Sequence, residues 1–354
     1  MARALQGEDR LLRWLRRRID RPLIGDDAAV LPPGGPFAVT VDSQISGVHF
    51  VPGLDAAAIA RRLVAVNLSD LAAMGAMPSY AFLALAAAPD FDHRRFFRAL
   101  LAACARHRLV LAGGDLSRPP AGAQGAPGAH GCNGSPGGND VLVATLTVLG
   151  EKRRGGRWLR RGGAAPGHHV WLGGTAGESA AGRLLIAAGA RFAAGRVSLP
   201  AGWGGARPRG RDGVAAAGRR AVHRHLLPRP QLALGQWLGR QAAGAAIDVS
   251  DGVARDLYRL CAESGVGARI EAARLPLAPG FASLCSALGA DGEQLALHGG
   301  EDYVLLFTLP AAVEPPARFG CRRIGTIARG RRLWLVAGGG PARELAPAGW
   351  DHLA

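Results

Sequence analysis

The chain has 354 residues and a formal net charge of +16, and 48% of its residues are hydrophobic. This composition excludes a disordered chain, and the length is sufficient for two domains. No apolar run reaches the roughly 18 residues that a membrane span needs, and residues 1–20 contain no apolar signal core. With five scattered cysteines and no CxxC pair, we expect a cytoplasmic protein without a membrane partner.

The positive charge comes almost entirely from arginine, because Lys152 is the only lysine. Arginines gather in residues 4–18, 151–161 and 206–220, without aromatic residues at the spacing of a base-stacking platform. We interpret them as solvated surface charge and expect no nucleic-acid partner. A basic nucleic-acid-binding module remains the distant alternative.

The first part of the chain alternates between helical and strand patterns. The predicted elements are a helix over 4–18, a strand over 37–43, a helix over 55–77 ended by Pro78, a strand over 80–88, a helix over 91–108 and strands over 109–115 and 141–150. Residues 119–140 are rich in Gly, Pro and Ala, which predicts a surface insertion.

The second part repeats this alternation. Its predicted elements are a strand over 168–174, helices over 177–189 and 230–243, a strand over 245–250, a helix over 252–265, the segment 267–277, a helix over 280–288 and a strand over 303–310. A second low-complexity insertion is expected over 190–222. The pattern predicts an α/β or α+β protein of two domains, residues 1–152 and 157–354.

Acidic residues recur where strands end and where glycines open a loop. They are Asp26 and Asp27 in IGDDAAV, Asp42 in FAVTVD, Asp115 in GGDLSR, Asp248 and Asp251 in DVSDG, and Glu301 and Asp302 in GGEDY. Taken singly, each is explained as a turn former or a helix N-cap. Asp70 is different, because it lies within an apolar helix, where an unpaired carboxylate is costly.

The expected partner of these carboxylates is a metal ion, because side-chain cations are scarce in their motifs. No basic residue occurs in GDDAAV, NLSD or DVSDG, and Mg²⁺ prefers carboxylate, carbonyl and water oxygens. A Mg²⁺ cluster on a glycine-lined loop suggests a polyphosphate ligand. The absence of GxxxxGK[ST] and VAIK motifs excludes P-loop and protein-kinase chemistry.

The chain resembles the thiamine-monophosphate kinase family over nearly its whole length outside the two insertions. The motifs that carry the resemblance are, in order, IGDDAAV, VDSQISGVHF, AVNLSDLAAMGAMP, GGDLSR, RRGGAAPGHHVWLGGTAGESAAG, AIDVSDG, GGEDY and GWDH. The resemblance implies the aminoimidazole ribonucleotide synthetase-like fold, a homodimer formed by the N-terminal domains and a C-terminal domain over a nucleotide cleft. It also implies Mg²⁺-dependent transfer of phosphate from ATP to thiamine monophosphate, giving thiamine diphosphate.

The same resemblance implies roles for individual residues. The implied Mg²⁺ ligands are Asp27, Thr40, Val41, Asp42, Asp70, Asp115, Asp248 and Asp251. The implied ATP contacts are Gly114, Asp115, Arg161 and Ser250, with Arg160 as the alternative to Arg161, and the implied substrate contacts are His49, Glu301 and Trp350. No catalytic residue is expected, because the attacking phosphate oxygen is already anionic and in-line transfer needs no general base.

Several positions depart from the family pattern. Val41 stands where threonine is usual, and Leu116 and Ser117 replace the usual pair of threonines. GGEDYV lacks the usual glutamate after the tyrosine, and HLLPRPQ lacks the usual arginines. Other ATP-using enzymes of the superfamily, such as selenophosphate synthetase or aminoimidazole ribonucleotide synthetase, remain the alternative. The N-terminus lacks the reactive cysteine that is typical of selenophosphate synthetase. The hydrogenase maturation factor of the same superfamily is a further alternative, but it usually ends in a cysteine, whereas this sequence ends in DHLA.

Overall fold

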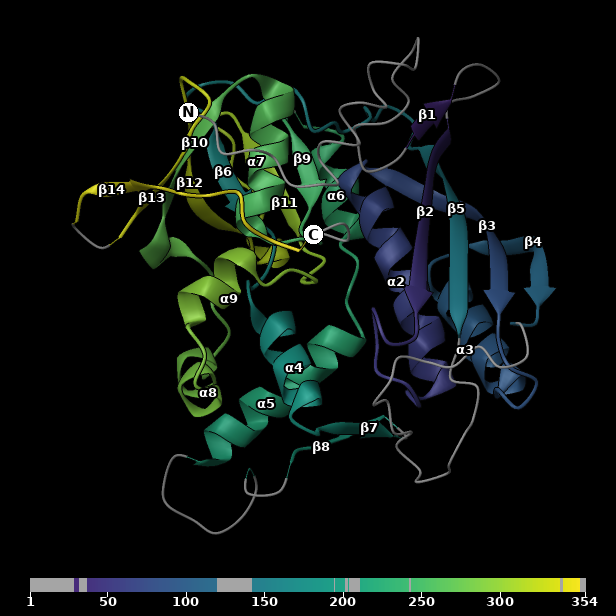
Figure 1. The fold of residues 1–354 in the computed structure, drawn as a ribbon. Helices are drawn as coiled ribbons and strands as arrows, with labels where there is room; N and C mark the ends of the chain where they lie inside the picture. Colours follow the sequence, from purple (N-terminus) through teal and green to yellow (C-terminus); the bar gives the residue numbers. More distant parts are fainter. Residues whose placement is uncertain are drawn as a thin grey trace.

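The structure, a computed structural model, has two large β-sheets with a long helix between them (Figure 1). It describes residues 29–31, 37–119, 142–193, 195–200, 203, 211–241, 243–337 and 340–350. The predicted helix over 4–18, Asp26, Asp27 and nearly all of the insertion 119–140 lie outside these residues. Within the described ranges, no helix has both the length and the apolar content that crossing a bilayer requires.

The first half of the chain forms a five-stranded sheet with helices on one face. Its strands, in spatial order, are β1 (Ala29–Leu31), β2 (Phe37–Ile45), β5 (Val143–Lys152), β3 (Ala76–Ala86) and β4 (Val110–Ser117). All neighbours are antiparallel except β3 and β4, which are parallel because α3 (His93–Arg106) crosses between them. Strand β5 shows the alternation that builds the core, since Ala144, Leu146 and Val148 are buried while their neighbours are half-buried.

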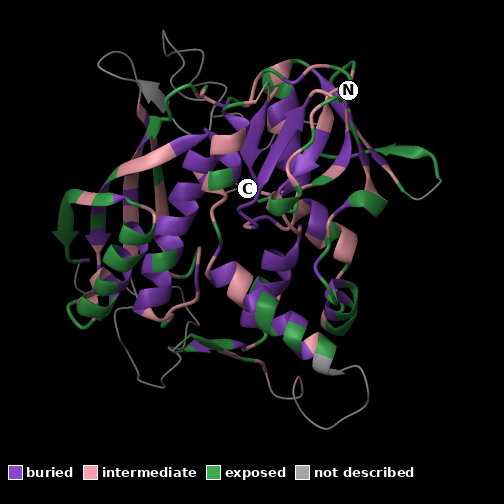
Figure 2. Ribbon diagram, turned by 180° about the vertical axis from the view of Figure 1, so that it is seen from behind, coloured by how far each residue is buried: buried purple, intermediate pink, exposed green. Residues whose placement is uncertain are grey.

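Helix α2 (Ala56–Ala73) is buried around almost its whole circumference, as Figure 2 shows. It packs against the first sheet on one side and against elements of the second half on the other, and only Arg61 and Asp70 escape full burial. The prediction that Pro78 ends this helix was wrong. The helix ends at Ala73, where Gly75 adopts a left-handed φ of +69°, and Pro78 lies in β3 beside a register shift, a place where a strand tolerates proline.

The second half forms a seven-stranded, mostly antiparallel sheet. Its strands, in spatial order, are β14 (Ala342–Glu344), β13 (Leu333–Val336), β10 (Gly267–Glu271), β12 (Arg322–Ala328), β6 (His169–Leu172), β11 (Leu305–Leu309) and β9 (Ala246–Asp248). Helix α7 (Val253–Ser264) packs on this sheet, and α6 (Leu232–Leu238) packs against α2. The division into domains at residues 152 and 157 agrees with where the two sheets begin and end along the chain, but it stays a prediction.

A helical layer completes the second half. It consists of α4 (Glu178–Ala187), α5 (Arg211–Leu226), α8 (Phe281–Leu288) and α9 (Gly292–His298), with the hairpin β7 (Arg191–Ala193) and β8 (Arg196–Ser198). The described part of the low-complexity segment 190–222 contains this hairpin and most of α5, and its assignment as an insertion stays a prediction. Helix α5 approaches α4 closely, because a Cβ added at Gly182 of α4 would lie 2.1 Å from the carbonyl oxygen of Ala221.

A similar close approach joins α6 to α2 and gives a test of the fold. A Cβ at Gly235 would lie 1.9 Å from the carbonyl oxygen of Ala72. We predict that Gly235→Ala lowers the free energy of unfolding by about 1–3 kcal/mol, because overpacking forces the two helices apart. Urea unfolding monitored by circular dichroism measures the change.

The matched control is Gly213→Ala in α5, because a Cβ there meets no atom within 4 Å. This variant should leave the free energy of unfolding unchanged or raise it by up to ~1 kcal/mol, since alanine has less conformational entropy to lose. Equal stability of the two variants would contradict the packing of α6 on α2.

Candidate active site

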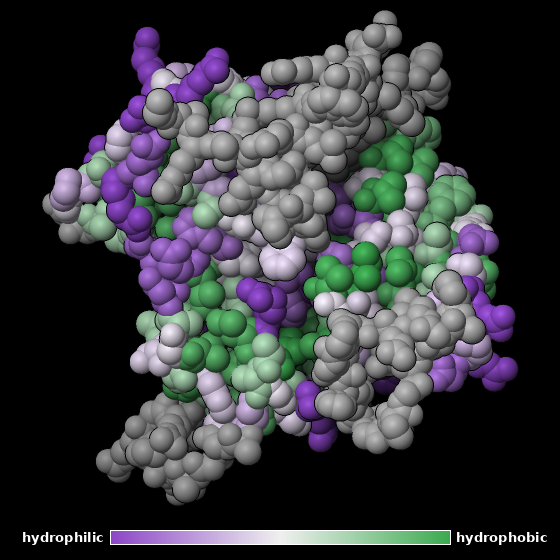
Figure 3. Space-filling view, viewed as in Figure 1, coloured by the Kyte–Doolittle hydropathy of each residue, from purple (hydrophilic) through white to green (hydrophobic). Residues whose placement is uncertain are grey.

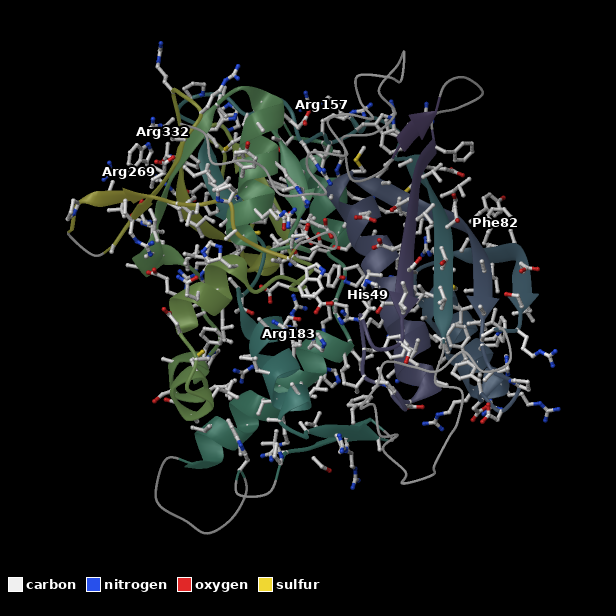
Figure 4. The ribbon with its side chains drawn as sticks, viewed as in Figure 1. His49, Phe82, Arg157, Arg183, Arg269 and Arg332 are labelled. Carbon is white, nitrogen blue, oxygen red and sulfur yellow. The ribbon has the colours of Figure 1, made fainter. Side chains whose placement is uncertain are left out.

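A cavity of about 340 Å³ lies between the two halves of the chain. The first half lines it with Asp42, Ser43, Gln44, Val48, His49 and Asp70. The second half lines it with Arg161, Arg183, Asp248, Ser250, Asp251, Arg259, Gly299, Glu301, Tyr303 and Trp350. Figure 4 shows His49 and Arg183 at the centre of the molecule, on elements of the two different halves. The fold thus brings nine of the predicted site residues to one cavity from sequence positions 42 to 350.

Asp42 and Asp70 are the two aspartates of the first half that line the cavity, and they come from strand β2 and helix α2. Thr40, Asp42 and Gln44 share the face of β2 that is turned toward α2. The Thr40 hydroxyl donates to Asp70 Oδ2 at 2.5 Å, and the Asp42 amide donates to the Asn67 side-chain oxygen at 3.0 Å. Thr40 therefore orients Asp70, whereas Val41 points to the opposite face and its side chain is 57% exposed.

Two aspartates of the second half lie around the turn between β9 and α7. Asp248 is the last residue of β9, and Asp251 follows it in the loop. The loop is closed by Asp256, whose carboxylate accepts from the amides of Asp251 and Gly252 at 3.0 and 3.1 Å. Arg259 Nη1 donates to Asp251 at 2.5 Å. Burial, reinforced by the charge of Asp251, raises the pKa of Asp256 to about 7.

The GGEDY loop is bonded to this turn and is held in an uncommon conformation. Glu301 and Tyr303 have left-handed φ angles of +58° and +48°. Their amides donate to the carbonyl oxygens of Ser250 and Val249 at 2.6 and 2.8 Å. Left-handed backbone at residues other than glycine costs on the order of 1–3 kcal/mol each and concentrates at functional sites. The loop thus fixes Glu301 beside Ser250.

Asp302 stabilises the same loop from behind. Its buried carboxylate accepts from the amides of Gly177 and Ser179 at 2.7 and 3.1 Å, which caps the N-terminus of α4. Burial raises its pKa to about 6, although the two amide donors act in the opposite direction. Sequence reasoning assigned no role to Asp302 or Asp256, because an acid beside a helix start reads as an ordinary cap.

The arginine and the tryptophan predicted for the site both line the cavity. Arg161, rather than Arg160, is in its wall, and the backbone oxygen of Arg160 accepts from the amide of Ala246 at 2.8 Å. The Trp350 amide donates to the carbonyl oxygen of Asp251 at 3.1 Å, and its own carbonyl oxygen accepts from Arg255. These bonds hold the C-terminal segment against the DVSDG turn and leave the Trp350 ring 47% exposed.

Gly114 and Asp115 were predicted for the site, but neither lines the cavity of the single chain. Asp42, Leu146, Leu83 and Gly114 are successive partners across β2, β5, β3 and β4. Three strand spacings therefore separate Asp42 from Gly114, roughly 14 Å, and Asp115 points to the opposite face of the sheet. Glycine is required at position 114 by the neighbouring strand, because a Cβ there would lie 1.9 Å from the carbonyl oxygen of Leu83.

The carboxylates of the cavity are suited to a Mg²⁺ ion that is bound partly by substrate phosphates, rather than to an ion coordinated by protein side chains alone. Among the described residues, no three His, Cys, Asp or Glu side chains stand close enough to hold one ion together. Four aspartates and Glu301 instead line one cavity from two sides, and no cysteine is among its lining residues. Mg²⁺ retains several waters and is commonly bound by one or two carboxylates together with substrate phosphates. Oxygen ligands spaced around a cavity meet that requirement.

Comparisons with known proteins match this arrangement. The family model "AIR synthase related protein, N-terminal domain" matches residues 25–131. The thiamine-monophosphate kinase of Salmonella typhimurium is 35% identical over 294 residues, which cover 81% of this chain and 76% of the relative. The solved structure described as "AaThiL complexed with AMPPCP and TMP" is 25% identical, has a TM-score of 0.77 and covers 99% of each chain.

A structure from another branch shares the fold alone. The HypE–HypF complex matches with 19% identity and a TM-score of 0.68, over 95% of this chain and 98% of the other. Together these likenesses confirm the predicted fold class.

The raised pKa of Asp302 predicts a pH dependence of stability. Its native pKa of about 6 lies above the ordinary value of 3.8, so the native state binds a proton between these values that the unfolded state releases. The contribution of this group to stability is fully present below pH 4 and is lost as pH rises through 6. We predict a loss on the order of 2–3 kcal/mol across this range, which Asp302→Asn does not show.

The difference between wild-type and Asp302→Asn melting temperatures, measured from pH 4 to pH 7, isolates this contribution. The wild type should lose stability relative to the variant as pH rises. A difference that stays constant or moves the other way would contradict the assigned burial of the carboxyl group.

Proposed function

This chain belongs to the thiamine-monophosphate kinase family and phosphorylates thiamine monophosphate with ATP, and we propose that the transfer takes place in the cavity between its two halves. The family predicted from the sequence motifs is thereby confirmed. The observation that carries the proposal is the convergence of Asp42, Asp70, Asp248 and Asp251 on one cavity. The product, thiamine diphosphate, follows from the acceptor.

The chemistry asks for positioning and charge neutralisation rather than proton transfer. The acceptor is a phosphate oxygen that is anionic at neutral pH, so an in-line attack on the γ-phosphate of ATP needs no general base. Two polyanions must approach each other, and Mg²⁺ supplies the neutralising charge when it is bound. We therefore assign no single catalytic residue in this chain.

We propose individual roles for the residues that the family resemblance implies, supported by their place in the cavity wall. We assign Mg²⁺ binding to Asp42, Asp70, Asp248 and Asp251, with Thr40 orienting Asp70. Val41 contributes at most its backbone oxygen, and Asp27 keeps its expected role outside the described residues. Ser250 and Arg161 are assigned to the nucleotide, and His49, Glu301 and Trp350 to thiamine monophosphate. The reaction is assigned to the cytoplasm.

A homodimer is supported by the outer face of the first sheet. Large apolar side chains are exposed on β2, β3 and β4, and Figure 3 shows hydrophobic surface over this part of the molecule. They are Val41, Tyr80, Phe82 and Val110. Exposed apolar surface of this kind marks an interaction site, and two-fold pairing of identical faces is the commonest way to cover it.

The dimer also offers a role for the GGD motif. Gly114 and Asp115 lie on the edge strand of this same sheet. We propose that a second copy docks against the exposed face, and that its edge strand brings Asp115 toward the carboxylates that a single chain keeps apart from it.

Loss of one cavity carboxylate should abolish turnover. We predict that Asp42→Asn and Asp70→Asn each lower kcat/KM by roughly 10²–10⁴-fold, because a missing ligand weakens metal-assisted charge neutralisation by several kcal/mol. Thiamine diphosphate formed from ATP, Mg²⁺ and thiamine monophosphate is quantified by chromatography.

The control is Asp291→Asn, which changes an acid that caps α9 away from the cavity and replaces it with another good N-cap. It should retain full activity. Wild-type rates in both Asp42→Asn and Asp70→Asn would refute the metal assignment.

Charge on the apolar face should separate the dimer. Phe82→Asp places a carboxylate where we expect a desolvated interface, so sedimentation velocity should show mostly monomer at micromolar concentration. Leu277→Asp, at an apolar side chain that is exposed elsewhere, should leave the sedimentation coefficient unchanged. A wild-type monomer, or a Phe82→Asp dimer of unchanged affinity, would reject this interface.

A further inference from the structure

Arg62 is one of the largest side chains in the chain to be completely buried, with 0% exposure. Removing a guanidinium from water costs several kcal/mol unless its charge and its donors are matched. Here Nε donates to Gln44 Oε1 at 2.8 Å, Nη1 donates to the carbonyl oxygen of His225, and Nη2 forms an ion pair with Glu301. The guanidinium carbon also lies 5.8 Å from the centre of the Tyr303 ring.

These partners come from both halves of the molecule. Arg62 belongs to α2 and Gln44 to β2, whereas His225 belongs to α5 and Glu301 to the GGEDY loop. Gln44 shares a face of β2 with Asp42, two residues away. The guanidinium thus links the strand that carries a metal-binding aspartate to the loop that carries a substrate-binding glutamate.

Glu301 is the acidic member of this network, and it reaches both the guanidinium and the cavity. Its side chain is 23% exposed and lines the cavity, and its second carboxylate oxygen lies 3.5 Å from His225 Nδ1. Burial, with the nearby charge of Arg62, lowers the pKa of His225 to about 3, so this imidazole is neutral. Arg62 is therefore the cation paired with Glu301 on the buried side.

We propose that Arg62 is a positioning residue for the acceptor substrate: it holds the Glu301 carboxylate at the cavity wall and sets its place relative to Asp42, without touching the substrate itself. The inference rests on the proposed function, in which Glu301 contacts thiamine monophosphate. The acceptor carries a permanently cationic thiazolium ring, for which a fixed carboxylate is a suitable partner. A displacement of about 1 Å in such a site is enough to lower turnover roughly 10²-fold.

A purely structural role makes a different prediction. If Arg62 only joined the two halves, its loss would lower stability and affect both substrates alike. A positioning role changes the acceptor and spares the nucleotide, because Arg62 holds the side chain of Glu301, whereas Ser250, a proposed ATP contact, accepts from the Glu301 backbone amide. The two readings are separated by the KM values of the two substrates.

The experiment compares Arg62→Gln, Arg62→Lys, Glu301→Gln and the double variant Arg62→Gln/Glu301→Gln. The matched control is Arg61→Gln, since Arg61 is the neighbouring arginine of the same helix and is exposed. KM for thiamine monophosphate, KM for ATP, kcat and the melting temperature are measured for each folded dimer.

We expect Arg62→Gln and Glu301→Gln each to raise KM for thiamine monophosphate at least tenfold, with KM for ATP within about twofold of wild type. The double variant should be no worse than the worse single variant, because residues acting as one unit are not additive. Arg62→Lys should lie between wild type and Arg62→Gln, since lysine keeps the charge but lacks the planar fork. Arg61→Gln should match wild type.

Equal increases in both KM values, or multiplied effects in the double variant, would overturn the inference. If Arg62→Gln does not fold, Arg62→Lys decides, and a wild-type KM for thiamine monophosphate in that variant rejects the positioning role. Failure of the proposed function is distinguishable, because the wild type itself would then form no thiamine diphosphate.

Discussion

The burial of α2 on two opposite sides is the constraint from which the rest of the structure follows. One side of the helix completes the core of the first sheet, and the other completes the core of the second half. The two halves are therefore held in fixed register by this helix. Asp70, one of only two residues of α2 that are not buried, then opens into the cavity between β2 and β9. The packing that stabilises the fold is also what assembles the site.

The energetic cost of this arrangement is concentrated in buried charge. Asp256 and Asp302 are completely buried carboxyl groups with raised pKa values. Asp256 accepts from the amide of the cavity-lining Asp251, and Asp302 accepts from the amides of Gly177 and Ser179 at the start of α4. Arg62 is buried between the halves in the same manner. Glu301 and Tyr303 add backbone strain in the loop above. Such costs are typical of a site whose geometry is fixed before its ligands bind.

The sequence reveals the acids of this site because each stands in a local context that needs explaining. Asp70 in an apolar helix and Asp248 with Asp251 around a glycine turn are visible without a structure. Arg62 is not, since it is one of many arginines and its partners come from distant elements.

Two further features depend on tertiary structure. The separation of Asp115 from Asp42 depends on strand order, which local patterns do not contain. The Ala- and Gly-rich segment 190–222 contains most of α5, and the close packing of this helix on α4 was not visible in its composition. The motifs thus predicted the family and most of the residues that line the cavity, whereas the supporting network became visible only in the folded structure.

Mg²⁺-dependent phosphoryl transfer is tested most directly by the product that the wild-type chain forms from ATP and thiamine monophosphate, with and without Mg²⁺. We expect equal amounts of ADP and thiamine diphosphate, dependent on Mg²⁺. ADP formed without thiamine diphosphate, or equal turnover after removal of Mg²⁺, would contradict this mechanism.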